Sequence, residues 1–277
     1  MLILLKQGKG FFHMGCSGHE ASQVAAALTL NQGKDWSYPY YRDGAFTLAL
    51  GVTTKQHLLS FLARADDPAS GGRQMPMHYG NKNLRIVSQS SATGTQYLQA
   101  VGCALSRKLD KTKEIVYVSS GEGTTSQGDF HEALNWAGRE KAPVIFHIQD
   151  NEYAISTHRS EQTAGSVYSL VSGYENLSKY QVDGTDFFET HLAFKQAVER
   201  AKRGKGPSVI VSNVVRLMPH SSSDDQRKYR SEKALKKDLK RDPILAFKQI
   251  CIEKDIFSES DAEKIESKIK KQIDNDT

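Results

Sequence analysis

Two short apolar runs joined by one amphipathic segment constrain the fold of this chain more than any other feature. The runs are EIVYVSS (114–120) and PVIFHIQD (143–150), and residues 129–141 between them have helical periodicity. Strands that are apolar on both faces are typical of a parallel sheet covered by helices on both sides, and parallel neighbours need a crossover of this kind. The sequence therefore predicts a βαβ unit.

The pattern continues on both sides of this unit. Further along, the turn VDGTDFFE (182–189) precedes a helix that ends at Gly204 and an apolar strand over 207–215. The other predicted helices cover residues 18–30, 53–65 (capped by Thr53 or Thr54), 93–110, 245–254 and 260–273. We predict an α/β fold with a doubly wound parallel sheet over 1–215, and a polar loop and helices over 216–277 as an extension of the same domain. Residues 66–83 are rich in Pro, Gly and Asn and predict a long loop.

Composition argues against several other classes of protein. The only apolar opening, MLILL, is followed at once by Lys6 and is too short for a signal segment or a membrane span. The three cysteines have no CxxC spacing, so we expect buried thiols and neither disulfides nor zinc. The basic run 227–241 is more typical of a solvated helix face than of a nucleic-acid site. We expect a cytoplasmic protein, or an organellar one whose transit segment is missing.

Polar side chains follow both strands of the βαβ unit. Glu122 lies between two glycines after the first strand, and Asn151 follows the second. Ligands of open parallel sheets bind beyond the carboxyl ends of the strands, where these side chains converge if the strands are neighbours. Carboxylate, amide and carbonyl oxygens suit Mg²⁺, and Gly121 and Gly123 would let a diphosphate approach the backbone. The alternative is an ordinary strand-to-helix turn with a solvated glutamate.

The spacing favours the metal-binding interpretation. Residues 124–150 separate Gly123 from Asn151, which matches the GDG-to-N motif of thiamine diphosphate enzymes. The chain resembles the alpha subunit of the decarboxylating dehydrogenase component of 2-oxo acid dehydrogenase complexes. The matching blocks, in family order, are GHEASQVA, YYRDGAF, GGRQMPMH, GEGTTSQGD, NEYAIST, VDGTDFFE and PHSSSDDQRKYR.

The resemblance implies a site, residue by residue. Glu122 and Asn151 would bind Mg²⁺ through their side chains, and Tyr153 through its carbonyl oxygen. Residues implied to contact thiamine diphosphate are Tyr41, Arg42, Ser91, Thr93, Gly121, Gly123, Thr124, Gln149, Ala154, Ile155 and His220. His220 would be the catalytic loop histidine. Without the resemblance, His220 would count as an exposed loop side chain and Tyr41 as a structural aromatic residue.

Departures from the family pattern narrow the subgroup. Glu122 stands where many members have aspartate, and GEG resembles the branched-chain type. In that subgroup a potassium site matches Ser90, Ala92, Thr95 and Gln96, where Ala92 replaces a proline that contributes only its carbonyl. Asp150 stands where asparagine is usual, which adds a charge near the predicted metal.

The implied activity is oxidative decarboxylation of a branched-chain 2-oxo acid, with acyl transfer to a lipoyl group on an acyltransferase component. The activating glutamate would come from a beta subunit, separate or fused in a longer polypeptide, within a heterotetramer. Alternatives are a pyruvate- or acetoin-type subunit and a truncated, non-catalytic subunit. The short segment before GHEASQ suggests a shortened copy, a fragment or a misplaced start. Ser221 matches a serine that is phosphorylated in some members, although a mobile loop that orders with cofactor is the simpler expectation.

Overall fold

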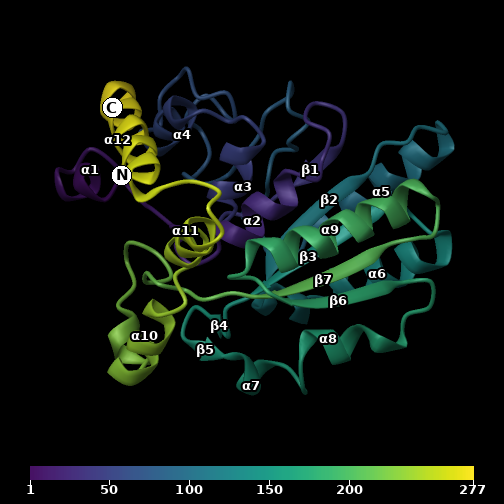
Figure 1. The fold of residues 1–277 in the computed structure, drawn as a ribbon. Helices are drawn as coiled ribbons and strands as arrows, with labels where there is room; N and C mark the ends of the chain where they lie inside the picture. The colour runs from purple at the N-terminus through teal and green to yellow at the C-terminus, as the bar shows by residue number, and fades with distance from the viewer.

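A five-stranded parallel sheet forms the centre of the computed structural model, which describes all residues from Met1 to Thr277 (Figure 1). The strand order is β1-β2-β3-β7-β6, and every neighbouring pair is parallel. The strands are β1 (Trp36–Tyr38), β2 (Val116–Gly121), β3 (Val144–Asp150), β6 (Ser178–Asp183) and β7 (Ser208–Asn213).

Helices cover both faces of the sheet. One face packs against α2 (Glu20–Ala27), α3 (Gly44–Ala49) and α9 (Phe187–Lys202), and the other against α5 (Gln96–Leu109) and α6 (Gly128–Glu140). Because successive strand residues point to opposite faces, Val116 and Val118 enter one core and Tyr117 the other. The predicted doubly wound α/β fold is confirmed.

The predicted βαβ unit is β2–α6–β3. Its strands pair from Val116↔Val144 to Gly121↔Gln149, and every residue of β3 is buried. Full burial on both faces explains why both strands read as apolar runs. The carboxyl ends of β2 and β3 therefore lie side by side, as the placement of Glu122 and Asn151 requires.

The sequence did not predict β1 and β6. Both are edge strands, and β6 has mostly partly exposed residues, so neither has the apolar pattern of a central strand. The predicted turn over 182–189 was too long, because α9 already begins at Phe187. Asp186 caps this helix by accepting hydrogen bonds from the backbone N–H groups of Phe188 (2.8 Å) and Glu189 (3.0 Å).

The remaining elements are short or peripheral. They are α1 (Leu2–Lys6), α4 (Thr54–Phe61), η1 (Glu122–Ser126), β4 (Tyr153–Ala154), β5 (Thr157–His158), α7 (Arg159–Gln162), α8 (Val167–Leu170), η2 (Val171–Gly173), η3 (Gln226–Lys228), α10 (Glu232–Leu239), α11 (Pro243–Glu253) and α12 (Glu259–Asp276). Thr53 caps α4 with a full capping box, and residues 66–83 form no helix or strand, as predicted. No helix combines the length and the apolar content needed to span a membrane.

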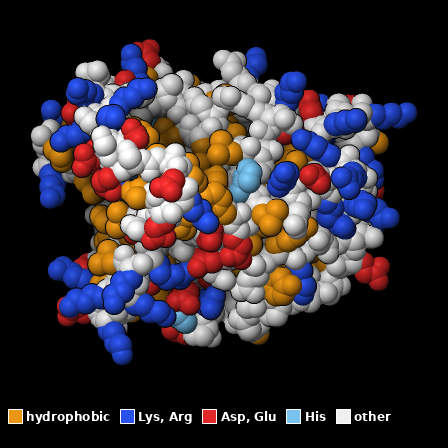
Figure 2. Space-filling model, viewed as in Figure 1, with side chains coloured by type: hydrophobic (Ala, Val, Ile, Leu, Met, Phe, Trp, Pro, Cys, Tyr) orange, Lys and Arg blue, Asp and Glu red, His pale blue; other side chains and the backbone are white.

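Lysines gather at the amino edge of the sheet, where α5, α6 and α9 end. Lys108, Lys111, Lys113, Lys141 and Lys202 line a hollow of about 160 Å³ there. Figure 2 shows blue Lys and Arg side chains over this end of the molecule. Cations stabilise the carboxyl ends of helices, and Lys108 donates a hydrogen bond to the carbonyl oxygen of Glu140 at the end of α6.

Candidate functional site

A cavity of about 260 Å³ lies at the carboxyl edge of the sheet. It is lined by Tyr40, Tyr41, Arg42, Thr93, Gly121, Glu122, Gly123, Thr124, Asn151, Tyr153, Ala154, Ile155 and His220. These residues come from separate segments: the turn after β1, the turn before α5, the β2–η1 junction, the β3–β4 turn and the loop after β7. The cavity contains every predicted magnesium and cofactor residue except Ser91 and Gln149, and adds Tyr40.

Glu122 and Asn151 are held next to each other by the pairing of β2 and β3. The backbone N–H of Asn151 donates to Oε2 of Glu122 at 3.2 Å. The Asn151 side chain is fixed as well, because its Oδ1 accepts from the Tyr153 N–H (3.2 Å) and its Nδ2 lies 3.2 Å from Nε2 of buried His19. Asn151 thus presents an oriented amide oxygen beside the carboxylate.

Glu122 is a buried carboxylate with no cation paired to it. Its residue is 2% exposed, and the one hydrogen bond to its carboxylate is the Asn151 N–H. Burial, followed by the nearby Asp150, raises the pKa of Glu122 to about 7. A buried carboxylate with so few partners is stabilised by a cation. The donor set of one carboxylate, one amide oxygen and a carbonyl fits Mg²⁺, which completes its shell with phosphate oxygens and water.

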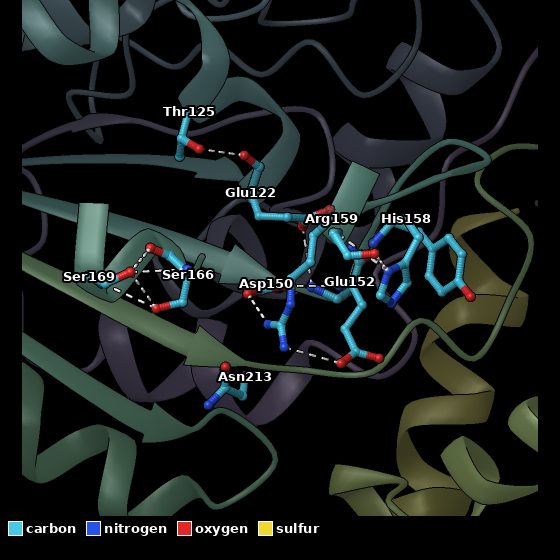
Figure 3. Close-up of polar contacts among 12 residues, drawn as sticks. Glu122, Thr125, Asp150, Glu152, His158, Arg159, Ser166, Ser169 and Asn213 are labelled. Atoms are coloured by element: carbon cyan, nitrogen blue, oxygen red, sulfur yellow. Dashed lines mark hydrogen bonds and ion pairs between the residues drawn. The ribbon is translucent and has the colours of Figure 1, made fainter. Parts of the chain in front are cut away.

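Asp150 does not add an uncompensated charge to this site, contrary to the expectation from the sequence. Its side chain is 1% exposed and forms an ion pair with Arg159 of α7, with Nη1 and Oδ2 2.5 Å apart. Figure 3 shows the Arg159 guanidinium between the carboxylates of Asp150 and Glu152. The negative charge is therefore neutralised within the site by a residue that the motif search did not include.

The two glycines around Glu122 have different surroundings. Gly121 lines the cavity, and a Cβ added there would meet no atom closer than 3.9 Å. A Cβ added at Gly123 would lie 2.7 Å from Cβ of Ala154, inside van der Waals contact. Gly123 is therefore required for the close packing of η1 against β4, whereas an added methyl at Gly121 would make only ordinary van der Waals contacts.

Arg42 and His220 both line the cavity and are hydrogen-bonded to each other. Arg42 is 2% exposed, donates to the carbonyl oxygens of Gly15 (2.7 Å) and His220 (3.2 Å), and places Nη2 3.1 Å from Nδ1 of His220. Burial, followed by Arg42, lowers the pKa of His220 to about 4, so the ring is neutral at pH 7. Because Arg42 can only donate, Nδ1 accepts and the proton of His220 is on Nε2.

A buried arginine that the sequence did not predict connects both sides of the cavity. Arg216 is 1% exposed and donates to the carbonyl oxygen of Ile155 (3.0 Å) and to the Tyr229 hydroxyl (2.6 Å). Tyr229 in turn donates to Asp224 (2.5 Å), whose carboxylate also accepts the N–H of His220 (2.8 Å). The only signal in the sequence was a charged residue directly after the apolar strand 207–215.

Comparisons with known proteins show the family of this chain. The family model described as "Dehydrogenase E1 component" matches residues 1–277. The chain belongs to the dehydrogenase E1 component family. Among similar proteins in this family, the 2-oxoisovalerate dehydrogenase subunit alpha of Bacillus subtilis (strain 168) is 42% identical over 260 residues, covering 94% of this chain and 78% of that protein.

Two other E1 relatives are more distant. The mitochondrial 2-oxoisovalerate dehydrogenase subunit alpha 1 of Arabidopsis thaliana is 34% identical, covering 97% of this chain and 57% of that protein. The pyruvate dehydrogenase E1 component subunit alpha of Bacillus subtilis (strain 168) is 33% identical, covering 98% of this chain and 71% of that protein. The chain thus spans between about half and four fifths of the length of these relatives.

Gln149 is buried and is not among the residues that line the cavity of this E1 chain, so its contact with the cofactor stays a prediction. It is fully buried, donates to Oδ1 of Asp43 (2.6 Å) and accepts from Nε2 of Gln23 (2.8 Å). Burial raises the pKa of Asp43 to about 7. As a strand residue next to Asp150, Gln149 points to the opposite face of β3 from Asp150.

Only part of the turn before α5 lines the cavity. Thr93 lines the cavity, whereas Ser91 instead lies 2.7 Å from Nε2 of His78. In the predicted potassium set, the Ala92 carbonyl accepts from Thr95 (3.1 Å), and the Gln96 amide oxygen accepts from the Gly94 N–H (3.1 Å). Ser90 is exposed. Its hydroxyl accepts from the Ala92 N–H (3.2 Å), so all four residues of the set have an oxygen that is hydrogen-bonded within the turn. The potassium site of this E1 chain stays a prediction.

Proposed function

We propose that this chain is the alpha subunit of a branched-chain 2-oxo acid dehydrogenase component, and that it holds thiamine diphosphate and Mg²⁺ in the cavity at the carboxyl edge of the sheet. The observation that carries the proposal is Glu122, a buried carboxylate without a paired cation that converges with Asn151 on this cavity. An ordinary solvated turn would leave the glutamate exposed.

Different residues of the cavity would bind the metal and the diphosphate. Glu122, the Asn151 amide oxygen and the Tyr153 carbonyl oxygen would hold the metal, while Tyr41, Arg42 and the backbone around Gly121 would hold the diphosphate. When bound, thiamine diphosphate supplies the electron sink for loss of CO₂ from the 2-oxo acid.

His220 is suited to donate a hydrogen bond to the substrate. It lines the cavity, is neutral at pH 7, and has its proton on Nε2 because Arg42 occupies Nδ1. A neutral donor can stabilise negative charge that develops on a carbonyl oxygen without itself repelling the metal. We assign this role to His220 as the catalytic residue of this chain.

A partner would complete the site. This chain supplies the metal and diphosphate half, and a beta subunit, separate or fused, would supply the group that activates the cofactor. Residues 1–215 would form the cofactor-binding domain, with 216–277 as the His220 loop and its helical extension. A lipoyl-bearing acyltransferase would accept the acyl group, in the cytoplasm of a bacterium or in a mitochondrial matrix.

The branched-chain assignment is favoured over the pyruvate- or acetoin-type alternative. The sequence identity to the 2-oxoisovalerate dehydrogenase subunit alpha of Bacillus subtilis is 42%, whereas the identity to the pyruvate dehydrogenase subunit alpha of the same organism is 33%. The non-catalytic alternative is disfavoured because Arg42, Glu122, Asn151 and His220 meet in one cavity.

A substrate panel tests the proposal. The chain is assembled with its beta partner and assayed with 3-methyl-2-oxobutanoate and pyruvate, and calorimetry measures thiamine diphosphate binding with Mg²⁺. We expect cofactor binding, preference for 3-methyl-2-oxobutanoate, and no turnover by the chain alone. Preference for pyruvate would reassign the substrate, and no cofactor binding by the assembled protein would favour the non-catalytic alternative.

A further inference from the structure

Asp150 and Arg159 form a charge pair directly beside the proposed metal ligand Asn151. The Asp150 side chain is 1% exposed and the Arg159 side chain 31%, with 2.5 Å between Oδ2 and Nη1. Arg159 also lies 3.4 Å from Glu152, whose side chain is 54% exposed (Figure 3). An exposed pair at that distance contributes little, so the contact with buried Asp150 is the one that matters.

Arg159 also fixes the backbone that carries Asn151. Its N–H donates to the carbonyl oxygen of Glu152 (2.9 Å), and the Glu152 N–H donates to Oδ1 of Asp150 (2.9 Å). The side chain and the backbone of Arg159 therefore both hold the two ends of segment 150–159 together. This segment includes Tyr153 and the β4–β5 hairpin. Glu152 has a φ of +71°, a strained conformation that such contacts help to hold.

The charge of Asp150 makes Arg159 necessary. A buried carboxylate that loses its only cationic partner is strongly unfavourable. Next to Glu122 it would also oppose a diphosphate and offer the metal a competing ligand. An asparagine, the residue usual in the family pattern at this position, would have no such need.

We propose that Arg159 is a positioning residue of the metal site, which neutralises Asp150 and orders the turn bearing Asn151 without touching the metal. This inference rests on the proposed function and adds a residue pair to it. Asp150 and Arg159 act as a unit, in which the arginine is required only while the aspartate is present.

A double-mutant cycle tests the proposal. Arg159→Met, Asp150→Asn and the double variant are assembled with the beta partner, and calorimetry gives the Kd of thiamine diphosphate at saturating Mg²⁺. We expect Arg159→Met to weaken binding about tenfold, and Asp150→Asn in that background to restore it to within about threefold of wild type. Unchanged binding in Arg159→Met, or a double variant as weak as the single one, would overturn the proposal.

Two matched controls separate this effect from a general loss of charge. Glu152→Gln removes only the exposed partner of Arg159, and Arg139→Met removes a surface arginine whose side chain is 70% exposed. Both should bind within about twofold of wild type, since exposed pairs contribute little. A tenfold loss in either would mean that the effect does not depend on Asp150.

The test remains decisive if Arg159→Met does not fold. Asp150→Asn is then compared with the double variant, because neither contains the Asp150 carboxylate. Equal affinities within about threefold support the proposal, and a tenfold deficit in the double variant overturns it by giving Arg159 a role independent of Asp150. Absence of binding in the wild-type protein is a separate result that counts against the proposed function.

Discussion

In this protein, side chains of the same type differ in their chemical properties because they differ in burial. Glu122 and Glu132 are both glutamates near the start of α6, but Glu132 is exposed and Glu122 is buried. Burial raises the pKa of Glu122 to about 7. Burial is what converts a common surface residue into a ligand that favours a cation. The sequence could name Glu122 through its motif, but it could not show this burial.

Replacing Glu122 tests its role directly. Glu122→Gln keeps the shape but removes the charge, so thiamine diphosphate binding at limiting Mg²⁺ should weaken by tenfold or more, about 1.4 kcal/mol. Calorimetry on the assembled protein measures this, with Glu132→Gln as the exposed control. An affinity equal to wild type would remove Glu122 from the site.

His147 gives a prediction about pH. It is fully buried between the Tyr117 hydroxyl (2.9 Å) and Ser212 (3.0 Å), and burial lowers its pKa to about 3. The folded state thus binds fewer protons than the unfolded state below pH 6.5. Stability from neutral His147 is complete above pH 6.5 and is lost as pH falls towards 3.

The His147→Gln variant should lack this part of the pH dependence. Between pH 7.5 and 5.5 the wild type should lose about 1.4 kcal/mol of unfolding free energy more than the variant does. Urea unfolding at both pH values provides the measurement, with His131→Gln as a partly exposed control. A constant difference between wild type and variant would contradict the prediction.

Among the elements, contacts around the β2–η1 junction decide whether the site can form. η1 packs against β4 through Gly123 and Ala154, and the Gln162 side chain of α7 donates to the Gly123 carbonyl oxygen (2.6 Å). The turn that carries Glu122 therefore packs against two further short elements, β4 and α7. Neither β4 nor α7 is stable by itself, so the junction supports them and they support it.

Two glycines of the same motif should respond differently to a methyl group. Gly123→Ala forces β4 away from η1, because the new Cβ would lie 2.7 Å from that of Ala154, whereas Gly128→Ala meets no atom within 4 Å. We expect Gly123→Ala to cost about 1–3 kcal/mol of unfolding free energy and to weaken cofactor binding, with Gly128→Ala neutral in both. Chemical unfolding and calorimetry would show it, and equal behaviour of the two variants would contradict the assigned packing.

At the scale of the whole molecule, sequence patterns predicted the central strands and the site edge, and missed what depends on distant contacts. β2 and β3 were predictable because burial on both faces makes them apolar, whereas β6 is an exposed edge. The resemblance to the family named most of the residues that line the cavity. It could not find Arg216 or Arg159, because each acts through partners brought close only by folding.

The loop after β7 is hydrogen-bonded to the N-terminal segment that precedes α2. The Ser222 N–H donates to the His13 carbonyl oxygen (2.8 Å), and the His13 N–H donates to the Ser222 hydroxyl (3.1 Å). The Leu217 N–H donates to the Ser17 carbonyl oxygen (3.2 Å). The structure therefore gives this loop defined contacts on its own. A cofactor contact at His220 would add to them.

Trypsin digestion should show whether cofactor binding further orders the loop after β7. Arg227 has an 80% exposed side chain, and we expect thiamine diphosphate with Mg²⁺ to slow cleavage after it about tenfold in the assembled protein, because ordering lowers the population of open states. Cleavage after Lys264 on α12 serves as the control. An equal rate at Arg227 with and without cofactor would argue against ordering.

The lysine-lined amino edge has a counterpart at the other end of the same helices. α5 and α6 end among those lysines, so their amino ends, which carry partial positive charge, point towards the carboxyl edge of the sheet. Arg42 is the one cationic side chain that lines the cavity. The fold itself thus polarises the molecule, and the helix dipoles add to the charge of Arg42 at the edge of the sheet where the cavity lies.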